Sequence, residues 1–189
     1  MSARHPEVGP AAAAATVDWD GVVADLGARG NATIERLLAP AECDALSALY
    51  TVDPMFRSRV VMASHGYGRG EYRYFAYPLP GLIAELRESL YARLAPLANQ
   101  WNAAMGIAIR YPERHADFLE RCHAAGQRPR MQSRPEVVPL HQGDAAIFAV
   151  HHRPVAGPRG AHRVNHRHGV SRIRSGHRHT LGIIFHDAR

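Results

Sequence analysis

The side chains best suited to chemistry lie near the carboxyl end of the chain, in residues 168–186, HGVSRIRSGHRHTLGIIFH. If the second half of this stretch is a β-strand, its side chains alternate between two faces, and Arg178 and Thr180 share one face with small and apolar neighbours. A guanidinium is always charged and binds a carboxylate through two parallel hydrogen bonds. This face therefore predicts a pocket for a carboxylate, with Arg178 as its anchor.

A histidine that precedes this strand could add a metal ion to the site. His168 stands ten residues before Arg178, and a neutral imidazole is the commonest metal ligand among side chains. His166 shares the strand face of His168 and is the alternative ligand. The other histidines of this region are interpreted as surface side chains of a basic protein: His151, His152, His162, His177 and His179.

The order and spacing of His168 and Arg178 resemble the C-terminal signature of the 2-oxoglutarate/Fe(II) dioxygenases. Residues 138–150, VPLHQGDAAIFAV, are similar to that family's strand, Gly-Asp turn and following strand. The resemblance implies that His168 binds iron and that Arg178, with Thr180 beside it, binds 2-oxoglutarate. Within the superfamily, the chain is most similar to a bacterial subgroup described as oxygenases acting on damaged DNA.

The other two iron ligands of the family have no counterpart at the expected place. The iron site needs two histidines and one carboxylate, and the family supplies the missing pair as an H-x-D motif between its long helices and the V-P-L strand. Here the helical region ends near 126–127 and continues directly into Arg128. The resemblance therefore implies an internal shortening near 127–128 that has removed both ligands.

The string His115-Ala116-Asp117 also fits the H-x-D pattern, but it falls within a predicted helix over 112–125. Side chains two residues apart on a helix point roughly 200° apart and do not face each other. We therefore do not expect His115 and Asp117 to bind a metal ion together.

Two further features have a functional and a structural interpretation. Asp144 in the Gly-Asp turn is either a carboxylate at the mouth of a barrel or a residue that fixes its own turn, and the turn is favoured. Aromatic residues at 72, 74, 75 and 77 either line a substrate cleft, where they could stack a flipped base, or pack within a hairpin. We expect the packed hairpin.

The glycine-rich loop 63–70 lacks the Lys-Ser/Thr of a phosphate-binding loop, so it is interpreted as a hairpin connection or a substrate-side loop.

Composition places limits on the class of protein. The 189 residues contain no apolar run long enough to cross a membrane. Cys43 and Cys122 form no C-x-x-C pair, which favours a reducing cytoplasm. All 23 basic residues are arginine; residues 128–189 hold 11 of them against 3 acidic residues, whereas residues 1–127 hold 12 against 14. The arginine-rich region 128–189 therefore predicts an anionic partner such as nucleic acid.

The patterns along the chain predict an α+β fold, in which a helical N-terminal half packs on an incomplete double-stranded β-helix, or jelly-roll, sheet. Residues 1–16 are expected to be a disordered tail, and residues 17–189 one domain. Helices are predicted over 18–26, from Pro40, over 80–102 and over 112–125. Strands are predicted over 31–38, 57–62, 71–76, 137–140, 145–150, 164–170 and 178–186.

The favoured hypothesis is a homologue of the 2-oxoglutarate/Fe(II) dioxygenases whose substrate is damaged, alkylated nucleic acid, with a role in DNA repair. The resemblance implies Fe(II) and 2-oxoglutarate as cofactors, and the missing H-x-D segment implies impaired catalysis. Whether the chain is an enzyme stays open at this point. One alternative is a prolyl or other protein hydroxylase, because the same signature serves both. The other is a non-catalytic protein that binds nucleic acid or another polyanion.

Overall fold

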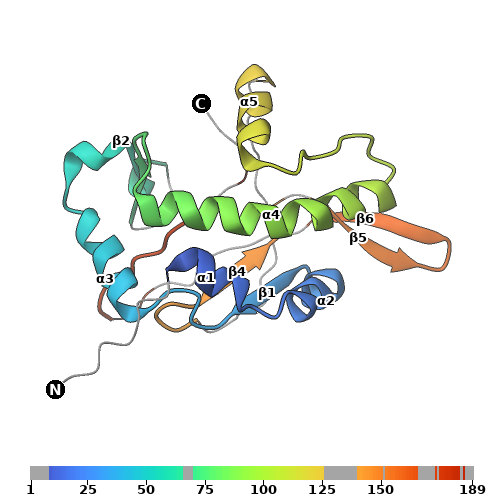
Figure 1. The fold of residues 1–189 in the computed structure, drawn as a ribbon, viewed down its shortest axis with the longest axis horizontal. Coiled ribbons are helices and arrows are strands. Elements are labelled where there is room, and N and C mark those ends of the chain that lie inside the picture. The colour runs from blue at the N-terminus through green and yellow to red at the C-terminus, as the bar shows by residue number, and fades with distance from the viewer. Residues whose placement is uncertain are drawn as a thin grey trace.

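One long helix organises the computed structural model of the chain (Figure 1). Helix α4 (Gly81–Ala104) forms because leucines recur at helical spacing, and it continues through Pro96. Its buried side chains include Ile83, Leu86 and Leu90. At 24 residues, α4 is about 36 Å long. The structure describes residues 9–65, 70–125, 140–150, 152–165, 173, 175–183 and 185.

The main hydrophobic core lies between α4 and the N-terminal elements. Helix α1 (Pro10–Ala15), helix α2 (Trp19–Arg29) and strand β1 (Asn31–Ile34) pack on one side of α4. The fully buried side chains Leu26 and Leu86 lie at the centre of this core. Burial of such side chains is the largest favourable contribution to folding.

Residues 10–15, predicted to be part of a disordered tail, form helix α1 instead. A run of five alanines has high helix propensity, and Pro10 starts the helix at its first turn, where its missing N–H is not needed. The helix is tied down because Ala14 is buried in the main core and its carbonyl accepts a hydrogen bond from Trp19 Nε1 at 2.8 Å. Residues 1–8 lie outside the described residues.

A two-stranded sheet joins the two halves of the chain. Strand β4 (Ala145–Phe148) pairs antiparallel with β1, with Asn31 opposite Phe148 and Ile34 opposite Ala145. The predicted strands over 31–38 and 145–150 are thus confirmed in part. Ala145 and Ile147 pack against the main core, so this pairing covers β1 with residues from beyond position 140.

A hairpin and a short helix form one end of the molecule. Helix α3 (Pro40–Leu49) is followed by the 3-10 turn η1 (Asp53–Met55), strand β2 (Phe56–Val61), the turn η2 (Met62–His65) and strand β3 (Glu71–Phe75). Strands β2 and β3 pair antiparallel, which confirms the predicted hairpin. Figure 1 places them beside the first turns of α4.

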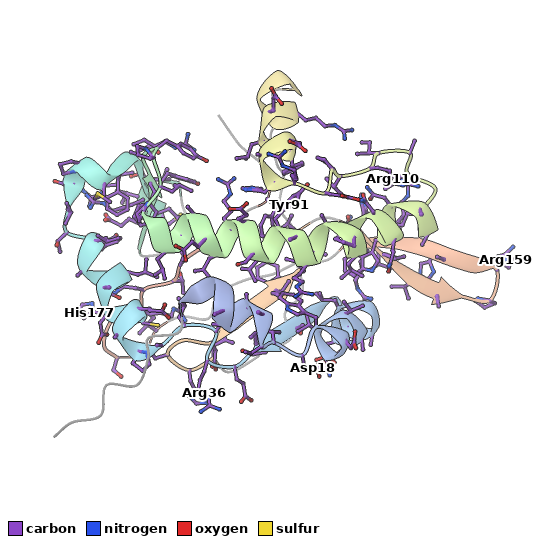
Figure 2. All side chains as sticks on the ribbon, viewed as in Figure 1. Asp18, Arg36, Tyr91, Arg110, Arg159 and His177 are labelled. Atoms are coloured by element: carbon purple, nitrogen blue, oxygen red, sulfur yellow. The ribbon has the colours of Figure 1, made fainter. Side chains whose placement is uncertain are left out.

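A second hairpin lies at the opposite end of α4. Strand β5 (His152–Gly157) pairs with β6 (Gly160–Asn165), and Arg159 marks the tip of this hairpin in Figure 2. The sequence pattern missed β5, because Pro154 and the flanking glycines interrupt its apolar alternation. The predicted strand over 164–170 begins earlier than expected, and residues 166–170 lie outside the described residues.

Helix α5 (His115–Ala125) packs on the other side of α4, where Phe118 joins Tyr91 and Ala95 in a second, smaller core. The predicted strand over 178–186 is wrong for its described part, since residues 178–183 and 185 form no strand. The α+β class is confirmed, and the sheets of the described residues are each two-stranded and form no closed barrel. No helix among these residues is long and apolar enough to cross a membrane.

Candidate functional site

The C-terminal segment, residues 177–183 and 185, contacts the rest of the protein through at least three of its side chains. The His179 ring lies 5.3 Å from the Tyr50 ring, Ile183 packs against the main core, and the Phe185 ring lies 5.8 Å from the Tyr91 ring. Figure 1 shows the segment passing from the α3 end of the molecule toward α5. The segment is therefore held on the protein at His179, Ile183 and Phe185.

Residues 177–182 of this segment are exposed. Arg178 and Thr180 are turned to solvent, and so are their neighbours His177, His179 and Leu181, so these residues do not divide into an inward and an outward face. Ile183 and Phe185 are partly buried because burying apolar side chains is favourable, whereas burying a guanidinium is costly. His177, exposed as predicted, lies near α3 in Figure 2.

The predicted metal ligands are not brought together by the described residues. His168 and its alternative His166 lie outside them, so their pairing with Arg178 stays a prediction. Elsewhere in the described chain, no group of three His, Cys, Asp or Glu side chains is placed to hold a metal ion. These residues alone do not fit an iron site, and we derive no reaction step through iron.

The H-x-D string at 115–117 lies on α5, as the helical pattern predicts. The His115 ring packs 5.0 Å from the Tyr91 ring, whereas Asp117 lies 3.9 Å from the guanidinium of Arg114. One side chain therefore belongs to the small core and the other to an exposed ion pair.

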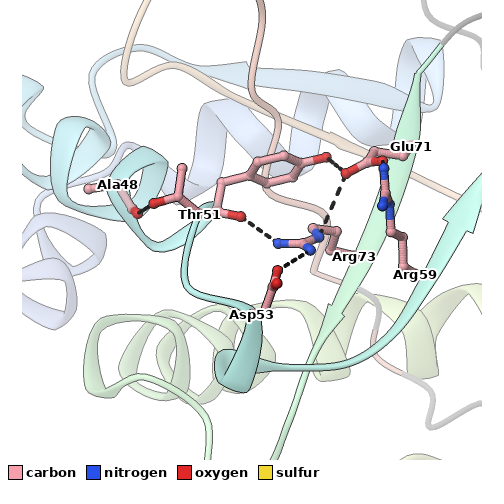
Figure 3. A network of polar contacts seen from close by, with 7 residues as sticks. Ala48, Thr51, Asp53, Arg59, Glu71 and Arg73 are labelled. Atoms are coloured by element: carbon pink, nitrogen blue, oxygen red, sulfur yellow. Dashed lines mark hydrogen bonds and ion pairs between the residues drawn. The ribbon is translucent and has the colours of Figure 1, made fainter.

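A polar network ties the β2–β3 hairpin to α3 and η1 (Figure 3). The Tyr50 hydroxyl donates a hydrogen bond to Glu71 Oε1, and Arg59 Nε donates one to Glu71 Oε2 at 2.5 Å. Arg73 donates from Nη1 to the Tyr50 carbonyl oxygen and from Nη2 to Asp53 Oδ1, each at 2.5 Å. Five side chains and one main-chain carbonyl thus connect the hairpin to α3 and η1.

Arg73 is the central cation of this network. Only 13% of its side chain is exposed. Its guanidinium carbon lies 4.8 Å from the Phe56 ring centre and 5.1 Å from the Tyr50 ring centre, so both aromatic rings interact with its charge. Because His179 packs on the same Tyr50 ring, the network also reaches the C-terminal segment that carries Arg178.

The network sets the protonation states of its members. The hydrogen bond from Tyr50, followed by the charge of Arg59, lowers the pKa of Glu71. Burial, together with that hydrogen bond, raises the pKa of Tyr50, and Asp53 raises the pKa of Arg73. At neutral pH the carboxylate is therefore ionised, the hydroxyl keeps its proton and the guanidinium is charged. Each group is engaged by the others, so we interpret the network as a structural support of the hairpin.

Acidification is expected to weaken this network, because the fold lowers the pKa of Glu71. The stability that its ionised form contributes is present above the ordinary pKa of a glutamate, about 4.3, and is lost as the pH falls through the lowered value. The melting temperature, followed by circular dichroism from about pH 7 to about pH 3, should fall more steeply for the native chain than for Glu71→Gln.

Glu113→Gln is the matched control, since Glu113 is exposed and takes no part in the network. Its melting profile should follow that of the native chain. Parallel profiles for Glu71→Gln and the native chain would contradict the assigned role of Glu71.

The Gly-Asp turn has the structural role that the sequence favours. Asp144 Oδ2 accepts a hydrogen bond from the His141 N–H at 2.8 Å, which closes the turn. Its Oδ1 accepts one from the Arg36 N–H at 2.9 Å, which joins the turn to the chain after β1. These two bonds, that from Arg36 first, lower the pKa of Asp144. The Asp144 carboxylate therefore fixes the backbone at His141 and Arg36.

The aromatic residues of β3 divide between two faces. Phe75 stacks on Phe56 with ring centres 4.7 Å apart, so the packed-hairpin prediction is confirmed for this residue. It is wrong for the tyrosines: Tyr72 is 53% exposed, Tyr74 45% and Tyr77 50%. Strand alternation could have indicated this, because Tyr72 and Tyr74 point to one face of β3, whereas Glu71, Arg73 and Phe75 point to the other.

Fold and site together define an arginine-rich α+β protein with a braced hairpin that exposes tyrosine rings. The chain belongs to a family of oxygenases acting on damaged DNA. The model of this family is described as "Oxygenase, catalysing oxidative methylation of damaged DNA" and matches residues 70–129 and 125–188.

Two similar proteins also match the chain. Uncharacterised proteins from two strains of Mycobacterium tuberculosis are each 31% identical to the chain over 167 residues, covering 60% of this chain and 72% of the relative. No solved structure gives a significant match.

Proposed function

We propose that the chain derives from 2-oxoglutarate/Fe(II) dioxygenases that act on alkylated DNA, and that an internal shortening near 127–128 has removed the H-x-D iron ligands. In this proposal His168, with His166 as its alternative, is the remaining iron ligand. Arg178 and Thr180 are what remains of the 2-oxoglutarate site. The protein keeps the recognition of damaged DNA and has lost most or all of the oxidation.

This proposal is supported by gaps in two comparisons, one with the family model and one with the Mycobacterium tuberculosis proteins. The family model matches in two pieces that meet at 125–129 and not in one continuous stretch. The alignment with the Mycobacterium tuberculosis proteins runs over 167 residues but uses 60% of this chain, which is about 113 residues. About 54 aligned positions of each relative therefore have no counterpart here, which is the length of several strands.

The described sheets support the same proposal. Strands β1 and β4 form a sheet of two strands, and each hairpin forms another. A jelly roll needs two larger facing sheets, so we interpret these pairs as parts of an incomplete one. Damaged DNA is favoured over a protein substrate by the description of the family and by the arginine excess of residues 128–189.

Restoring the missing segment is expected to restore turnover. The unmatched residues of one Mycobacterium tuberculosis relative would be inserted between Gln127 and Arg128, and succinate release measured with Fe(II), 2-oxoglutarate and methylated single-stranded DNA. We expect the native chain to stay at the enzyme-free background. The chimera should exceed it at least about 100-fold, because even supporting residues of a metal site contribute about 10–100-fold.

Two variants of the chimera serve as controls. His168→Ala should return succinate release to background, because it removes the remaining iron ligand. Arg178→Met should raise the 2-oxoglutarate concentration required, because it removes the carboxylate anchor. Equal turnover by native chain and chimera would overturn the proposed loss of ligands, and a chimera that melts cooperatively yet releases no succinate would overturn the dioxygenase assignment.

A further inference from the structure

We propose that the outward face of the β2–β3 hairpin, formed by Tyr72 and Tyr74, is a stacking platform for the bases of single-stranded DNA. The identity of the partner as DNA rests on the proposed function, whereas the platform itself rests on the geometry of the hairpin. Nothing in the iron or 2-oxoglutarate chemistry requires it.

The two rings have the spacing that separate bases need. Residues two apart on a strand share a face and lie about 6.8 Å apart along it. This is twice the roughly 3.4 Å rise per nucleotide of a DNA strand. Tyr72 and Tyr74 can therefore each take a separate base of an extended strand. Their exposed fractions of 53% and 45% leave the rings accessible.

The neighbours across the hairpin leave this face open. Val60 lies opposite Tyr72, and Ser58 lies opposite Tyr74. Residues directly opposite in an antiparallel pair share a face, so the cross-strand neighbours of both rings are small side chains. Two exposed tyrosines next to each other on one strand leave apolar surface in water, which is unfavourable unless a partner covers it.

The opposite face of β3 supplies rigidity. Glu71 and Arg73 alternate with the tyrosines and are bound to Tyr50, Asp53 and Arg59. A platform fixed before binding loses little conformational entropy when a base stacks on it. The polar network thus has a function in this proposal, which is to hold the two rings in place.

Charge near the platform favours a polyanion over an apolar protein surface. Strands β2 and β3 carry three arginines, of which Arg59 and Arg73 are bound to carboxylates on the opposite face, whereas Arg57 is exposed. The Arg57 guanidinium carbon lies 5.9 Å from the ring centre of Tyr77, and the Tyr77 hydroxyl accepts a hydrogen bond from Arg87 Nη1 at 2.7 Å. Arginines beside aromatic rings are the usual composition of surfaces that bind single strands without sequence preference.

Binding of a labelled oligothymidylate of about 12 nucleotides, measured by fluorescence anisotropy, tests the platform without iron or 2-oxoglutarate. Tyr72→Leu/Tyr74→Leu should weaken binding about tenfold for each ring removed, whereas Tyr72→Phe/Tyr74→Phe should bind like the native chain, since stacking needs only the ring. The Leu variant should keep the salt dependence of the native chain. Arg57→Gln should lower the slope of log affinity against log salt by about 1.

Ile109→Ala is the matched control, because Ile109 is an exposed apolar residue outside the hairpin, and its affinity should equal the native value. Unchanged melting temperatures show that all variants are folded. The platform is overturned if the native chain does not bind the oligomer, or if the Leu variant binds it as tightly as the Phe variant. If the Leu variant loses DNA binding and the chimera releases no succinate, the platform is upheld and the dioxygenase assignment is rejected.

Discussion

Replacing Gly143 with alanine is expected to lower the free energy of unfolding by about 3 kcal/mol or more. Gly143 has a φ of 90°, a conformation that alanine adopts only with strain. A Cβ there would also lie far inside the contact distance of the Leu38 carbonyl oxygen. That backbone cannot move aside easily, because the Leu38 N–H donates to the Gly143 carbonyl oxygen at 3.0 Å. Urea unfolding measures the change.

Gly106→Ala separates the two causes of this loss. Gly106 has a φ of 68°, but a Cβ built on it meets no atom within 4 Å. Only the left-handed backbone is unfavourable there, so we expect a loss of about 1–2 kcal/mol. If Gly143→Ala destabilises no more than Gly106→Ala, the close approach of the Gly-Asp turn to residue 38 is not important for stability.

Replacing Leu86 with alanine is expected to lower the free energy of unfolding by about 3–5 kcal/mol. Leu86 is 1% exposed and lies in the main core between α4 and the N-terminal elements. The substitution removes apolar contacts and leaves a cavity that packed helices cannot fill completely. Since a domain is typically stable by about 5–15 kcal/mol, this is a large part of the total. The urea midpoint should fall with little change in the slope.

Leu140→Ala makes the same chemical change on the surface. Leu140 is 49% exposed, so we expect a loss within about 0.5 kcal/mol. A similar loss for Leu86→Ala and Leu140→Ala would mean that the core assigned to α4 is not where the stability of the protein lies.

The elements that could be predicted are those with local patterns. The leucines of α4 recur at helical spacing, and β2 and β3 flank a glycine-rich turn, so both were found with nearly correct limits. The predictions were wrong where tertiary contacts determine the local structure. Residues 10–15 become helical against the core, whereas residues 178–183 have the sequence alternation of a strand but pair with no strand among the described residues.

The network at the hairpin could not be read from the sequence. Tyr50 caps the end of α3, Asp53 lies in η1, and Glu71 and Arg73 lie on β3. One acceptor for Arg73 is a main-chain oxygen that no sequence motif marks. Asp144 illustrates the same limit: its role in the turn was predictable, but its bond to the Arg36 N–H joins residues 108 positions apart. The pairing of His168 with Arg178 stays a prediction.

The pairing of β1 with β4 also has a consequence during translation. Strand β1 leaves the ribosome more than 100 residues before its partner is made. At about 5–20 residues per second, the nascent N-terminal half waits on the order of ten seconds for Ala145 and Ile147 to cover it. In that interval β1 is an unpaired strand edge, and we therefore expect the nascent chain to be more prone to aggregation than the finished protein.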